Sequence, residues 1–189
     1  MRRLFLSAAL LALILFHAGG VYAYDDGFGS AKKLTTKHFS VYYAPELDLG
    51  RLEGQLDVGT SISFALNEPF GNTGSLSGAL DALFGWASKA LDMNLYDLKG
   101  DIKICRDYKH LSEVYHNIFN AEPEAKSFYV VEFNAIYICP EAFKKEVLAH
   151  EMSHMIIAHY FMVPPPAKVQ EILCGYVEYE MRKSSRALK

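Results

Sequence analysis

Five consecutive residues, His150-Glu151-Met152-Ser153-His154, form the pattern H-E-x-x-H, which can do chemistry if it lies on a helix. Two positions four apart on a helix differ by only about 40° around its axis, so both imidazoles leave the same face. That spacing suits two nitrogen ligands at about 2.0–2.1 Å from one zinc ion. Glu151, about 100° round the axis, can take a proton from a water molecule at the metal without ligating it. The pattern therefore predicts a zinc site with Glu151 as general base.

A second helix supplies the candidate for a third ligand. Metallopeptidases that use a third histidine need Gly at position 157 and His at position 160, whereas this chain has Ile157 and Tyr160. His159 lies about 180° from His150 on the same helix and is predicted to be a structural or surface histidine. Glu171 follows the second histidine of the pattern by 17 residues, after three prolines that allow the chain to turn back. We expect the second helix to lie antiparallel against the first, with Glu171 in its first turn.

HEMSH followed by a glutamate on the next helix resembles the gluzincin metallopeptidases, the thermolysin-like and aminopeptidase-like group. The string E-I-L-C-G-Y-V-E, which begins at Glu171, is similar to the string around the third ligand of aminopeptidases, and the upstream segments resemble short bacterial peptidase MA-like domains. The resemblance covers residues 38–183. It implies one zinc ion (Zn2+) per chain, held by His150, His154 and Glu171. It also implies Glu151 as general base, and a peptide or protein substrate that adds as a strand beside the cleft.

The chain departs from the large gluzincins in its last part. It stops 18 residues after Glu171, so the downstream Tyr or His that stabilises the oxyanion in those enzymes has no counterpart. Local candidates for that role are Tyr160, Tyr176 and Tyr179, which the sequence does not rank. Glu178 lies two turns beyond Glu171 on the same face, where it either orients a ligand histidine or is simply solvated. These departures leave an alternative open, a catalytically inactive zinc-binding module that binds a peptide or protein partner.

The elements that must position these residues are predicted from hydrophobic periodicity and turn residues. Expected strands cover 38–43, 102–104, 127–131 and 135–139, the last two forming a hairpin. Expected helices cover 80–91, 111–119, 140–161 and 169–182. Pro45 is expected to begin a further helix, which is weakened by the glycines that follow. Residues 69–78 are expected to form a loop. Strands alternate with helices early and helices gather late, which predicts an α+β fold with a small mixed or partly antiparallel sheet.

The N-terminus predicts export. Two arginines precede an apolar run of 13 residues, Leu4–Phe16, and Ala23 stands where a signal peptidase reads a small residue. We therefore expect 1–23 to be a signal peptide cleaved near Ala23, 24–37 a flexible leader and 38–189 the metallopeptidase-like domain. The protein would then be exported to the periplasm or the extracellular space without a stable membrane span. The alternative is an uncleaved anchor, although 13 helical residues span only about 20 Å of the ~30 Å hydrocarbon core.

Charge and cysteine content narrow the classes of function. With 19 basic and 22 acidic residues the formal net charge is -3. Removal of 1–23 would leave 17 basic residues against the same 22 acidic ones, so the mature chain would be more acidic. The charge therefore indicates no basic surface for nucleic acid. Three cysteines leave at least one unpaired. Cys105 and Cys139 end predicted strands and either form a disulfide or stay reduced, while Cys174 is interpreted as a small core residue. The sequence indicates no oligomeric state.

Overall fold

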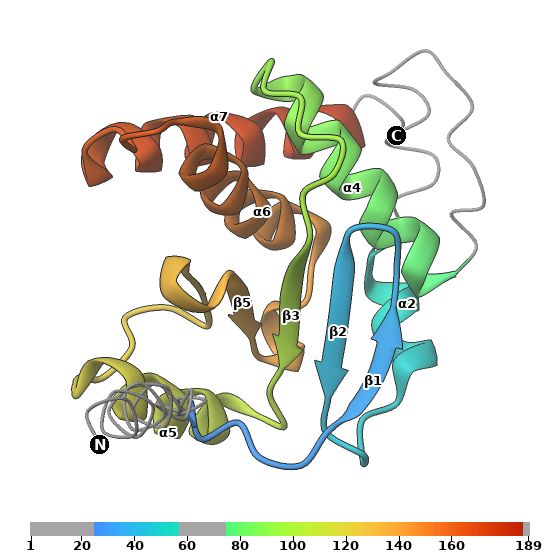
Figure 1. Ribbon diagram of the computed structural model, residues 1–189. Coiled ribbons are helices and arrows are strands. Elements are labelled where there is room, and N and C mark those ends of the chain that lie inside the picture. Colours follow the sequence, from blue (N-terminus) through green and yellow to red (C-terminus); the bar gives the residue numbers. More distant parts are fainter. Residues whose placement is uncertain (1–24, 57–74, 187–189) are drawn as a thin grey trace, which may run out of the picture.

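A five-stranded mixed sheet lies at the centre of the computed structural model, which describes residues 25–56 and 75–186 (Figure 1). The strand order is β1-β2-β3-β5-β4; the three inner strands are parallel, and each edge strand is antiparallel to its neighbour. The strands are β1 (Lys32–Thr35), β2 (Phe39–Tyr43), β3 (Gly100–Ile104), β4 (Ser127–Val130) and β5 (Ala135–Ile138). The α+β fold and the hairpin formed by β4 and β5 are confirmed.

One helix, α6, is enclosed by the sheet and by other helices. It packs on β4 and β5, α4 lies beside it, and α7 covers the side away from the sheet (Figure 1). Nine of its 16 residues are buried, and three of these are the polar Lys145, Glu151 and Ser153, so its burial is not confined to one apolar stripe. The helices of the described part are α2 (Leu49–Leu56), α4 (Leu76–Ala90), α5 (Tyr108–Phe119), α6 (Lys145–Tyr160) and α7 (Ala167–Arg186).

Aromatic side chains pack against both faces of the sheet. On one face Phe39 of β2 meets Phe84 of α4, with ring centroids 5.7 Å apart. On the other face Phe128 of β4 stacks on Tyr137 of β5 at 4.9 Å and meets Tyr115 of α5 edge to face at 4.9 Å. The sheet is therefore a rigid platform between two layers, and β4 lies at its open edge.

The segment expected to be a flexible leader is attached to the sheet over its described part, so that prediction is wrong for residues 25–37. β1 pairs with β2, and Phe28 is buried against α5. The buried Asp26 forms an ion pair with Lys103 of β3 and accepts a hydrogen bond from Tyr137 of β5. Burial alone would raise the pKa of Asp26, but these two hydrogen bonds outweigh it and lower the pKa below 3.8. These partners lie far away in sequence, which is why the local composition suggested a free leader.

Three other expectations need correction or lie outside the described residues. The helix expected at 140–161 is split, because a 3-10 turn (Pro140–Ala142) is followed by two non-helical residues, the first of which, Phe143, is fully buried. The loop expected at 69–78 already belongs to α4 from Leu76, and 69–74 lies outside the described residues. The expected signal peptide also lies outside them. Among the described helices, none is long and apolar enough to cross a membrane.

Cys105 and Cys139 follow neighbouring parallel strands and are both fully buried. The amide of Cys105 donates a hydrogen bond to Ile138 O at 2.9 Å, so the two cysteines occupy adjacent positions in the register of β3 and β5. Both are free thiols, as is Cys174. Burial raises the pKa of each of the three thiols, that of Cys139 to about 11. The disulfide that the sequence left open is therefore not formed in this structure.

Candidate metal centre and catalytic carboxylate

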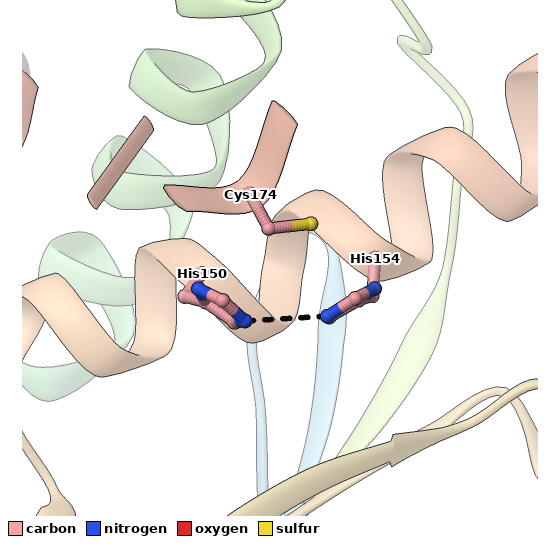
Figure 2. A group of neighbouring side chains, drawn as sticks. All are labelled: His150, His154 and Cys174. Carbon is pink, nitrogen blue, oxygen red and sulfur yellow. Dashed lines mark hydrogen bonds between the residues drawn. The ribbon is translucent and has the colours of Figure 1, made fainter. Parts of the chain in front are cut away.

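The two histidines of the H-E-x-x-H pattern point from α6 toward one another. Their Nε2 atoms are 3.3 Å apart, one helical turn along the same face (Figure 2). Their side chains are 22% and 17% exposed, so each is reachable while held by its surroundings. The pKa of His154 is lowered by burial and by His150, against the opposing effect of Glu171. A neutral imidazole is the form that binds a metal ion, so this environment favours ligation.

Glu171 of α7 reaches both histidines. Its Oε2 lies 3.5 Å from Nε2 of His150, and its Oε1 lies 3.3 Å from Nε2 of His154. Ligand atoms about 2.0–2.1 Å from a tetrahedral zinc ion are separated by about 3.3–3.4 Å. The three donor atoms therefore fit one zinc ion without movement of either helix, and α7 brings to α6 the glutamate that the sequence singled out.

A buried thiol lies next to these candidate ligands. Sγ of Cys174 and one nitrogen of each histidine all lie within 4.8 Å of one another (Figure 2). Cys174 is three residues beyond Glu171 on α7 and has no exposed surface, as expected of a core residue. The spacing of three residues places it on the same helix face as Glu171, although the sequence favoured a core residue over a ligand. The donor set is thus two nitrogens, a carboxylate and, within reach, a sulfur.

Glu151 lies beneath the histidines in a buried position that is 6% exposed. Its Oε1 accepts a hydrogen bond of 2.7 Å from the hydroxyl of Ser127, the first residue of β4. Burial raises the pKa of Glu151 to about 7; the Ser127 hydrogen bond opposes this, and the charges of Glu171 and Glu178 add to it. A carboxyl with a pKa near neutrality both accepts and returns protons readily. Ser127 was missed by the sequence reasoning, because nothing local connects it to a residue 24 positions later.

Glu178, two turns along α7, faces the other side of the His150 ring. Its Oε2 lies 3.4 Å from Nδ1 of His150, an atom that is buried and has no hydrogen-bond partner in the described part of the chain. Glu178 is also paired with Arg182, four residues later. The sequence left open whether Glu178 contacts His150 or is solvated. Its side chain is 25% exposed, which agrees better with the contact than with full solvation. A small rotation of the carboxylate would give the hydrogen bond that orients a ligand histidine.

The two histidines, Glu151 and Glu171 line a cavity of about 700 Å³. Ser127 and Tyr129 of the edge strand β4 line it, together with His150, Glu151 and Glu171. The hydroxyl of Tyr129 already donates a hydrogen bond of 3.2 Å to Asn134. The free edge of β4 thus borders the cavity that contains the three donor atoms.

The three tyrosines considered as oxyanion donors are not brought to this cavity. Tyr160, Tyr176 and Tyr179 are 47%, 50% and 60% exposed, and none of them lines it. His159 is exposed at the end of α6, where its ring contacts Met155 O at 2.9 Å, as its position on the helix predicted. No family model matches the chain, and comparisons with curated proteins and with solved structures found no match.

Proposed function

We propose that this chain is a zinc-dependent metallopeptidase in which His150, His154 and Glu171 hold one zinc ion. The observation that carries the proposal is the set of separations between their donor atoms, 3.3, 3.3 and 3.5 Å, which match a tetrahedral zinc site. Random side chains on two packed helices seldom bring two imidazole nitrogens and a carboxylate to one point. The carboxylate of Glu151 beside them supplies the proton-transfer group that a hydrolase needs.

The chain's own residues would divide the reaction among them. When bound, a zinc ion lowers the pKa of a water molecule to about 7 and polarises the scissile carbonyl. Glu151 takes the proton from the attacking water and passes it to the leaving amine, while Ser127 holds the carboxylate in place through Oε1. The unpaired edge of β4 offers backbone N–H and C=O groups to an extended peptide beside the cavity.

A second candidate function follows from Cys174. If its Sγ completes the tetrahedron, the site has four protein ligands and no open position, which is the arrangement of structural zinc sites. The protein would then be a catalytically inactive zinc-binding module that binds a peptide or protein partner. The two functions share His150, His154 and Glu171 and differ in what occupies the fourth position.

Metal content and cobalt spectroscopy separate the two functions. We expect elemental analysis to find one zinc ion per chain in the wild type and none in His154→Ala. We also expect the wild type to cleave a mixture of unstructured peptides, and both a chelator and Glu151→Gln to abolish this cleavage. Glu146→Gln, on the same helix outside the cavity, is the matched control and should retain activity. Cobalt-substituted protein should lack a thiolate charge-transfer band. If the wild type shows such a band, the band disappears in Cys174→Ser, and no peptide is cleaved, then the inactive zinc-binding module is supported and the metallopeptidase is refuted.

We propose further that the chain is exported with residues 1–23 removed. The support is the sequence pattern around Leu4–Phe16 and Ala23. N-terminal sequencing of protein from the exported fraction should give a start near Tyr24. A start at Met1 in membrane-bound material would instead favour the anchored form.

A further inference from the structure

The outer face of α7 and the loop before it expose large apolar side chains. Met162 and Val163 of the loop are 103% and 83% exposed. On α7 the exposed fractions run from 42% to 62%. We call this set the outer stripe; its members are Met162, Val163, Val169, Ile172, Tyr176 and Tyr179. Exposed apolar side chains gathered in this way mark an interaction surface rather than ordinary solvent-facing surface.

The four helical members of the outer stripe form one line along α7. Their spacings of three, four and three residues keep them within an arc of about 80°. The residues that α7 buries are on a different face: Cys174, Val177 and Met181. In Figure 1 α7 lies on the side of α6 away from the sheet, so the outer stripe faces outward. The helix therefore carries apolar side chains on two faces, one of which is left exposed by the residues that the structure describes.

Cationic residues accompany the outer stripe. Lys168 is exposed just before Val169, and Lys183 continues the line of the stripe one turn beyond Tyr179, with its side chain 65% exposed. Two acidic residues lie beside the stripe: Glu180 is paired with Lys183 at 3.7 Å, and Glu171, whose side chain is 60% exposed, faces the two histidines. Tyrosines and aliphatic side chains bordered by lysines are the composition of a helix that lies in a membrane interface.

We propose that the outer stripe docks the protein onto the surface of an anionic lipid bilayer. Met162 and Val163 enter the boundary of the acyl chains, the tyrosine rings lie at the level of the headgroups, and Lys168 contacts lipid phosphates. A second copy of the chain is the other occupant of this surface, and the test below distinguishes it from a bilayer. The proposal does not depend on the zinc site.

Docking in this way would set the orientation of the cavity. Pro164 follows directly on Val163, Gln170 follows on Val169, and both line the cavity that contains His150 and His154. The mouth of the cavity and the outer stripe are thus continuous along the loop and the first turn of α7. A protein docked through the stripe would present this cavity to chains at the membrane surface.

A fluorophore attached at residue 162 tests the contact directly. The three native cysteines are fully buried, so Met162→Cys in the full chain can be labelled with an environment-sensitive nitrobenzoxadiazole dye. Lys109→Cys on α5, whose lysine side chain is 86% exposed at the opposite end of the molecule in Figure 1, is the matched control. With vesicles containing phosphatidylglycerol we expect a blue shift and a gain in intensity at 162 and neither at 109.

Two further variants in the labelled protein separate the apolar and the electrostatic contributions. Ile172→Ser should lower the partition coefficient about tenfold on these vesicles. Lys168→Gln should lower it about fivefold on anionic vesicles and leave it unchanged on phosphatidylcholine. Both side chains are exposed, so the thermal unfolding midpoints should match that of the parent protein.

Three results would overturn the proposal. No shift at 162 while the chain cosediments with vesicles would mean that another segment, such as residues 4–16, makes the contact. Equal shifts at 162 and 109 would mean nonspecific adsorption. A shift at 162 that grows with protein concentration in the absence of lipid would identify a second copy as the occupant.

Discussion

The raised pKa of Glu151 leads to a prediction about stability that requires no substrate. Burial raises this pKa from 4.5 to about 7. Because each pKa unit corresponds to about 1.4 kcal/mol, ionised Glu151 costs the folded, metal-free protein about 3 kcal/mol. The side chain is only 6% exposed, so screening by solvent reduces this value little. Since the folded state binds the proton more tightly than the unfolded state, stability is full below pH 4.5 and is lost as the pH rises through about 7.

Urea unfolding in the presence of chelator measures this loss. Between about pH 5 and about pH 8 the free energy of unfolding of the wild type should fall by about 2–3 kcal/mol more than that of Glu151→Gln, which cannot ionise. Glu146→Gln, on the same helix but less deeply buried, should behave as the wild type. Zinc should shrink the difference, because a cation beside a carboxylate lowers its pKa. Identical pH dependence in wild type and Glu151→Gln would refute the reasoning and show that the carboxyl is solvated.

The hydrogen bond from Ser127 lowers the pKa of Glu151, so the pKa should be higher in Ser127→Ala. The same unfolding experiment on this variant should therefore show the loss of stability at higher pH. An unchanged pH profile would contradict the contact between Ser127 and Glu151. Glu178→Gln should weaken zinc binding roughly 10-fold or more in a competition with a chromogenic chelator, whereas equal affinity would assign Glu178 to solvent. Asp26→Asn leaves the partly buried Lys103 without its counter-charge and should lower the free energy of unfolding by about 3 kcal/mol. A loss below about 1 kcal/mol would show that the N-terminal segment is not clamped to the sheet.

The proximity of the three candidate ligands could be predicted because helix geometry determines most of it. His150 and His154 are four residues apart on one helix, so their side chains share one face, and their Nε2 atoms lie 3.3 Å apart. Glu171 required one more assumption, that the chain turns back after the prolines, and the short α6–α7 connection leaves few other directions. Glu171 and Glu178 are seven residues, or about two turns, apart on α7, so the helical period predicts that both lie on the same face of the helix.

Contacts that join distant strands could not be predicted in the same way. Ser127 and Glu151 are 24 residues apart and Asp26 and Tyr137 are 111 apart, and each pair forms only once the strand order is known. The local sequence of β1, K-K-L-T, has too few apolar residues to predict a strand, because as an edge strand it is mostly exposed. The split before α6 likewise depends on the burial of Phe143, which is a property of the core rather than of the sequence around Pro140.

A single side chain on α7 separates the two candidate functions. Three positions along a helix turn by about 300°, so a helix that offers Glu171 to the histidines also places residue 174 beside the site. Cys174 holds a sulfur within 4.8 Å of a nitrogen on each histidine, where a side chain without a donor atom would leave the fourth position to water. A structural site uses all four positions, whereas a hydrolase must keep one open. If the site holds zinc as we propose, the distance from Sγ to the metal, rather than any rearrangement of the fold, would decide between the two proposed functions.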